Sequence, residues 1–111
     1  MRGSRMVVVA AILLVVLAAT ASFALAATKT VGVKKKGSHF LWNPPVLRIK
    51  KGDTVKWSWT GNVPHNVTGP GFHSKTANKL TYSRKFTRAG TYRVVCTIHK
   101  SLGQRMVIRV S

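Results

Sequence analysis

Apolar and polar residues alternate in short runs over much of the chain after residue 45. Within each run the apolar residues lie an even number of positions apart, a spacing that places them on one face of a β-strand. The runs carry Leu47 and Ile49; Val55, Trp57 and Trp59; Leu80, Tyr82 and Phe86; Tyr92, Val94 and Cys96; and Met106, Ile108 and Val110. Turn-forming residues lie between them, as in Lys51-Gly52-Asp53 and Arg88-Ala89-Gly90. Short alternating strands between frequent turns predict an all-β fold, an antiparallel β-sandwich.

Charged residues fill many positions between these apolar residues, among them Arg48, Lys56 and Arg93. We expect them on the solvated outer face of the sandwich. The basic opening from Val31 to Gly37 includes Lys34-Lys35-Lys36. For this run we expect a solvated loop, or otherwise part of a surface that docks polyanions.

The first 27 residues have the composition of a secretory signal peptide. Arg2 and Arg5 precede an apolar run of fourteen residues, Met6–Ala19. Ala24-Leu25-Ala26 then places small residues at the spacing that a signal peptidase recognises. The apolar run is short for a membrane span, which needs about 20 residues. We therefore expect cleavage, and retention as an uncleaved N-terminal anchor is the alternative.

Cleavage leaves one domain, residues 28–111, with the mature chain starting at Ala27 or Thr28 and no transmembrane span after it. The signal predicts a secreted protein, located in a periplasm or at an extracellular cell surface. We expect a monomer. A domain of this size buries only about 60% of its unfolded surface. A single cysteine forms no intramolecular disulfide, so a bound metal ion is the natural source of extra stability.

The charge of the chain is strongly positive. Seventeen of its 19 basic residues follow residue 27, and Asp53 is the only acidic residue, which gives the expected mature domain a net charge of +16. Such a charge indicates an anionic partner or surface. The signal peptide argues against specific nucleic-acid binding and leaves acidic proteins and anionic cell-surface polymers.

One thiol and two imidazoles are the candidate metal ligands. Cys96, the only cysteine, ends an alternating strand, and His99 follows three positions later. His65 lies about thirty residues upstream in Pro64-His65-Asn66. A lone cysteine is often a small buried hydrophobic residue, and a lone histidine is often an ordinary loop residue. Together, at one end of a β-sandwich, these three are the ligand set of a blue-copper electron-transfer site. His39 and His73 lack such a context.

The chain resembles the cupredoxins, the plastocyanin-like small blue copper proteins. The matching segments, in order, are residues 46–57, His65-Asn66-Val67, residues 86–92 and Cys96-Thr97-Ile98-His99. The resemblance covers nearly all of residues 28–111 and implies a Greek-key sandwich that binds one type 1 copper ion. It also implies that Asn66 ties the two ligand loops together by hydrogen bonding.

In this family the last histidine presents a ring edge through an apolar patch, where electrons pass. The resemblance suggests Val63, Pro64, Pro70, Phe72 and Leu102 as members of that patch.

The fourth ligand is where the chain departs from the commonest family pattern. Relatives place a methionine three to five residues after the last histidine, where this chain has Leu102, Gly103 and Gln104. Met106 belongs to an alternating strand and is expected in the core. The resemblance implies that Gln104 is the axial ligand and that the reduction potential is low for the class. The alternatives are a nearly trigonal site with Leu102 in the axial space, or Gln104 as a surface polar residue.

These features favour a secreted electron carrier without substrate chemistry of its own, hence a protein that is not an enzyme. It would accept single electrons from one redox partner and pass them to another. Two other functions stay open: an envelope protein that binds or delivers copper, and a basic β-sandwich module that binds anionic polymers.

Overall fold

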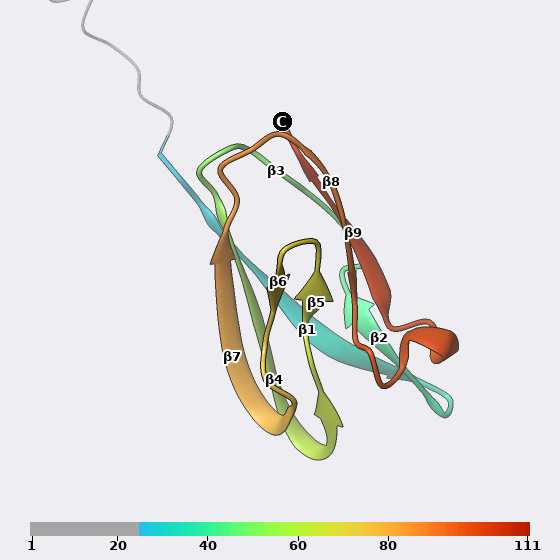
Figure 1. The fold of residues 1–111 in the computed structure, drawn as a ribbon. Coiled ribbons are helices and arrows are strands. Elements are labelled where there is room, and N and C mark those ends of the chain that lie inside the picture. The colour runs from blue at the N-terminus through green and yellow to red at the C-terminus, as the bar shows by residue number, and fades with distance from the viewer. Residues whose placement is uncertain (1–24) are drawn as a thin grey trace, which may run out of the picture.

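Nine strands and one short helix make up the computed structural model, which describes residues 25–111 (Figure 1). The strands are β1 (Thr28–Lys36), β2 (His39–Asn43), β3 (Val46–Ile49), β4 (Thr54–His65), β5 (Thr68–Gly69), β6 (Phe72–His73), β7 (Ala77–Lys85), β8 (Gly90–Val95) and β9 (Arg105–Val110), and a 3-10 helix, η1 (Lys100–Leu102), lies between β8 and β9. In Figure 1, η1 is the red coil that joins β8 to β9 at the end of these strands away from the C-terminus.

The strands form two sheets, which confirms the expected all-β sandwich. One sheet has the order β2-β1-β4-β7, and the other has the order β3-β9-β8-β5-β6. The pairs β1–β4 and β3–β9 are parallel, whereas the remaining neighbours are antiparallel. The sheets are therefore mixed rather than antiparallel throughout. Alternation reports which face of a strand is buried, and it carries no information about the direction of the neighbouring strand.

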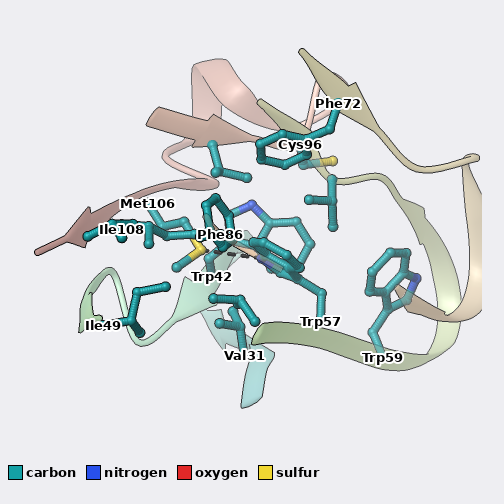
Figure 2. Packing of buried hydrophobic residues seen from close by; sticks show 14 residues of the cluster. Val31, Trp42, Ile49, Trp57, Trp59, Phe72, Phe86, Cys96, Met106 and Ile108 are labelled. Atoms are coloured by element: carbon teal, nitrogen blue, oxygen red, sulfur yellow. Dashed lines mark hydrogen bonds between the residues drawn. The ribbon is translucent and has the colours of Figure 1, made fainter. Parts of the chain in front are cut away.

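The core lies between the sheets and contains most of the predicted alternating residues (Figure 2). Leu47, Leu80, Tyr82 and Tyr92 are only partly buried against it, and Val31, Trp42, Val67 and Phe72 are core residues that the alternation did not predict. Trp57 is fully buried at the centre of the core, and its indole N–H donates to the Met106 sulfur over 3.3 Å. Met106 is thus a core residue, as expected. Phe72 is only 6% exposed and packs against Trp57 and Phe86. Its suggested place in a surface patch is therefore wrong, because the ring completes the hydrophobic core.

The predicted turn at Lys51-Gly52-Asp53 is present between β3 and β4, with Gly52 at a φ of 93° that favours glycine. The lysine run Lys34-Lys35-Lys36 lies in strand β1 rather than in a loop, and it pairs with β2 across a turn at Gly37. The predicted signal sequence lies mostly outside the described residues. Within residues 25–111 no helix is long and apolar enough for a membrane crossing.

Candidate metal centre

Three potential ligands meet where β4 and β8 end. His65 is the last residue of β4, Cys96 follows β8 directly, and His99 stands just before η1. One ligand atom from each of these residues lies within 4.8 Å of the other two. The Cys96 sulfur is 3.5 Å from Nδ1 of His99. The three side chains singled out from the sequence are therefore close enough to hold one ion, and no backbone movement is needed to bring them together.

Gln104, the residue just before β9, completes the cluster. Its side chain is fully buried, and its Oε1 atom lies 3.1 Å from Nδ1 of His65 and 2.9 Å from Nδ1 of His99. Its Nε2 atom is buried and has no hydrogen-bond partner among the described residues. A buried amide with one end unsatisfied is costly in a core that serves packing alone. The arrangement aims the oxygen at the point between the imidazoles.

The loop from Cys96 to Gln104 holds these side chains by its own backbone bonds. The Cys96 N–H donates to the Gln104 carbonyl over 3.0 Å and so closes the loop. The N–H groups of Leu102 and Gln104 both donate to the His99 carbonyl. Gly103, at a φ of 93°, lets the chain turn back so that the next residue points inward. Leu102 is 41% exposed at the surface, so Gln104, and not Leu102, lies beside the candidate ligands.

Asn66 connects the two ligand loops. Its side-chain oxygen accepts from the Thr97 N–H over 3.1 Å and from the Thr68 hydroxyl over 3.0 Å. Its side-chain N–H₂ donates to the hydroxyls of Thr76 and Thr97 over 3.0 and 2.8 Å. All four bonds are made by a residue that is 5% exposed. The Asn66 side chain therefore links the loop that carries His65 to the segment between Cys96 and His99 by hydrogen bonds.

Phe40 is a site residue that the sequence patterns missed. Its ring centroid lies 5.2 Å from that of His65 and 5.2 Å from that of His99. Trp59 packs edge-on against His65, with 5.9 Å between the ring centroids. The signal that could have found Phe40 is its spacing of two from the buried Trp42 in β2. Phe40 therefore contacts both imidazoles, and Trp59 contacts that of His65.

Burial lowers the pKa of His65 below its ordinary value of 6.5; the hydrogen bond to Gln104 raises it, and the neighbouring His99 lowers it again. The net effect favours the neutral imidazole at neutral pH. A neutral imidazole has a free ring lone pair, which metal coordination requires.

The rim of the cluster is partly apolar and partly basic. Ile98 and Leu102 are 46% and 41% exposed on either side of His99. Lys100 follows His99 and is exposed, and the exposed Arg105 donates to its carbonyl over 2.8 Å. Lys35 lies 5.9 Å above the Phe40 ring. Of the other suggested patch members, Val63 and Pro64 are half-buried and Pro70 is exposed, whereas His39 and His73 are exposed and lie outside the cluster.

The donor set suits copper. A thiolate is a soft ligand that favours Cu(I), imidazoles suit both oxidation states, and two histidines with one cysteine form the trigonal set of blue-copper sites. A β-sandwich that gathers these groups at one end defines a cupredoxin, a small copper protein. A profile of copper binding proteins, plastocyanin/azurin family, matches residues 28–111. The chain belongs to this family, and its cofactor is copper.

Known proteins with similar sequences are copper proteins of the same kind. Amicyanin-alpha from Methylorubrum extorquens is 34% identical over 104 residues, which cover 81% of this chain and 87% of that protein. Plastocyanin from a Synechococcus species is 30% identical over 96 residues, which cover 72% of this chain and 71% of that protein.

Solved structures share the fold. A methionine-to-glutamine variant of amicyanin, in its Cu(I) form, matches with a TM-score of 0.63 at 31% identity over 76% of this chain and 82% of that chain. A purple cupredoxin from Nitrosopumilus maritimus matches with a TM-score of 0.63 at 23% identity, over 75% of this chain and 99% of that chain.

Proposed function

We propose that this protein is a blue-copper carrier of single electrons, with His65, Cys96 and His99 as its equatorial ligands. The observation that carries the proposal is the convergence of one thiol and two imidazoles within 4.8 Å in a chain of the plastocyanin/azurin family. Bound copper would supply a one-electron couple between Cu(I) and Cu(II). The protein contributes a ligand geometry that suits both oxidation states.

A pre-arranged site favours rapid electron transfer, because little has to move when the charge changes. Asn66 fastens one ligand loop to the other, and Phe40 packs against both imidazoles. Neighbouring groups of this kind orient ligands and tune metal affinity. The role of Asn66 in this proposal is therefore positioning rather than ligation.

We further propose that the Gln104 carbonyl oxygen is the axial ligand. Its support is the position of Oε1 beside Nδ1 of both histidines, together with the burial of the whole side chain. An amide oxygen is a known alternative to methionine in this position, and the axial ligand tunes the potential. We expect a potential at the low end of the class.

His99 is the proposed port for electrons, because it is the ligand at the partly exposed rim. The apolar side chains of Ile98 and Leu102 would make close contact with a partner. The cations of Lys35, Lys100 and Arg105 would attract an acidic one.

The location and assembly state belong to the same proposal. Residues 1–27 would act as a secretory signal, so that the carrier works as a monomer in the periplasm or at the cell surface. The composition of residues 1–27 supports this location. Binding to anionic cell-surface polymers is a further expectation from the net charge of the chain.

Repeated redox cycling tests electron carriage against copper delivery. The copper-loaded protein is reduced and reoxidised many times by voltammetry in the presence of a Cu(I) chelator. A carrier keeps its copper and gives a reversible one-electron wave in every cycle. Loss of the ion to the chelator within the first cycles would contradict the carrier function and favour delivery. An anionic polymer that binds wild type and Cys96→Ser equally well, without any redox wave in wild type, would favour the polymer-binding module.

A further inference from the structure

Asp53, the only acidic residue of the chain, has a main-chain partner at the beginning of the domain. The side chain is 7% exposed and lies in the turn before β4. Its Oδ2 atom accepts the Lys50 N–H over 3.0 Å, within the same turn. Its Oδ1 atom accepts the N–H of Ala27 over 2.8 Å, from a residue 26 positions away. Oδ1 of Asp53 is thus hydrogen-bonded to Ala27, the residue that precedes β1.

Ala27 is also hydrogen-bonded to the folded domain through its carbonyl group. Its carbonyl accepts the Thr54 N–H over 2.9 Å, and Thr28 is aligned with Thr54 in the parallel β1–β4 pair. Leu25, two residues earlier, is 91% exposed. Both backbone groups of Ala27 therefore belong to the folded domain.

We propose that the signal sequence is removed between Ala26 and Ala27, and that Asp53 is the binding site for the α-ammonium group this cleavage creates. The inference rests on the secretory signal proposed above. Of the two starts expected from the sequence, Ala27 and Thr28, it favours Ala27. Ala24 and Ala26 then occupy the two small-residue positions of the cleavage site.

The chemistry is hydrolysis of one peptide bond. Water adds across the Ala26–Ala27 bond, the Ala26 carbonyl becomes a carboxylate on the departing signal, and the Ala27 nitrogen becomes an amine that takes up a proton. The donor opposite Oδ1 thereby changes from a neutral amide N–H to an ammonium group. A charge-assisted bond of this kind is about twice as strong as a neutral one.

Cleavage one residue later would leave the carboxylate without this partner. Oδ1 would lose its donor from Ala27, and the Thr54 N–H would lose its acceptor. A buried polar group without its partner destabilises the folded state. The arrangement of the described residues therefore favours a mature chain that keeps Ala27.

Other cations surround the same carboxylate at a greater distance. A hollow of about 470 Å³ next to Asp53 is lined by the basic residues Lys29, Arg48, Lys50 and Arg109. The backbone N–H groups of Ala27 and Lys50 lower the pKa of Asp53 most, and the side-chain charges of Lys29 and Lys50 lower it less, by through-space attraction. Their long side chains can turn toward solvent, whereas strand β1 fixes the terminus in direct contact. The nearest charge dominates, because Coulomb energy falls with distance.

The experiment starts from the full precursor, expressed in a host that secretes it, in wild-type and Asp53→Asn forms. Mass spectrometry of the released protein identifies the first residue, and NMR titration gives the pKa of its α-amine. We expect residues 27–111, and a wild-type amine pKa that is about one unit or more higher than in Asp53→Asn. Asn78→Lys is the matched control, because it changes the net charge equally at the far end of β7, and it should leave the pKa nearly unchanged.

A released chain that begins at Thr28, or one that retains the signal, would overturn the proposal. An amine pKa that is equal in wild type and Asp53→Asn would overturn it as well. Where Asp53→Asn does not fold, the wild type alone decides: its amine pKa should be higher in the folded protein than in urea, and an equal or lower value would refute the contact. Copper spectra of the same samples test the proposed electron carrier separately. The metal centre includes His65, at one end of β4, whereas Asp53 lies beside the other end of that strand.

Discussion

Gln104 is the proposed axial ligand of the metal centre. It is fully buried although it is polar, and its oxygen faces two imidazoles while its nitrogen has no partner in residues 25–111. Its offset from His99 suggested this role, and Gly103 makes it possible by turning the chain inward. Leu102, the competing candidate, lies on the other side of Gly103. The backbone angle of Gly103 decides which of the two side chains points inward, and the alternation of apolar and polar residues does not predict that angle.

Replacing Gln104 with methionine should raise the reduction potential, because a thioether stabilises Cu(I) better than an amide oxygen does. Voltammetry of wild type and Gln104→Met measures the shift. Leu102→Met is the matched control at an exposed position and should leave the potential close to the wild-type value. An unchanged potential in Gln104→Met would rule out the glutamine as axial ligand.

The ionisation of Asp53 should make the stability of the folded protein depend on pH in the acidic range. The backbone hydrogen bonds from Ala27 and Lys50 lower the pKa of this carboxyl below its ordinary value of 3.8. Its contribution to stability is therefore present above the unfolded pKa of about 3.9, and it is lost as the pH falls through the lower folded pKa. Urea unfolding should show stability falling below about pH 4 in wild type, with a much weaker fall in Asp53→Asn. Parallel curves for the two proteins would contradict this account.

At the scale of elements, the strands with long apolar alternation were predictable and the first hairpin was not. The alternation predicted β4 from Val55, Trp57 and Trp59, and it predicted β9 from Met106, Ile108 and Val110. Strand β1 buries only Val31 and is otherwise rich in lysine and threonine, so tertiary pairing with β2 and β4 decides its structure. Phe40 was missed as a site residue for the same reason, since its strand was not recognised.

The Asn66 bridge between the ligand loops was predictable only through the family resemblance, because its partners Thr76 and Thr97 lie far away in sequence. Asn66→Ala removes four hydrogen bonds and leaves the Thr97 N–H without its acceptor. We expect a loss of about 1–3 kcal/mol in the unfolding free energy of the metal-free protein. Copper affinity should fall about 10–100-fold.

Denaturant unfolding and a competition titration with a copper chelator measure these two effects. Asn62→Ala, at an exposed position of the same strand end, is the control and should change neither. Equal stability and affinity in the two variants would show that the bridge does not position the ligands.

At the scale of the whole molecule, charge is the dominant feature. The chain has one acidic residue against 19 basic ones, and cations stand at the rim of the metal centre as well as at the opposite end. The net charge was readable from composition alone. The distribution of this charge around His99 was not, because Lys35 lies in β1 and Lys100 lies in η1, far apart in sequence.

Electron transfer from the reduced protein to an acidic redox protein should slow as salt rises, since the screening length is about 10 Å at 0.1 M ionic strength. Stopped-flow kinetics measures the rate constant. Lys100→Glu, beside the proposed port, should lower it at low salt far more than Lys85→Glu at the distant end of β7. A rate that is indifferent to salt and to both substitutions would show that charge does not guide docking.

The most direct test of the central claim is copper loading of the metal-free protein. Cu(II) is added while the visible spectrum and the electron paramagnetic resonance signal are recorded, with Cys96→Ser as the control. We expect an intense thiolate-to-copper charge-transfer band and narrow hyperfine splitting in wild type, and neither in Cys96→Ser. A pale, tetragonal Cu(II) spectrum in wild type would mean that His65, Cys96 and His99 do not bind one ion together, and would contradict the blue-copper assignment.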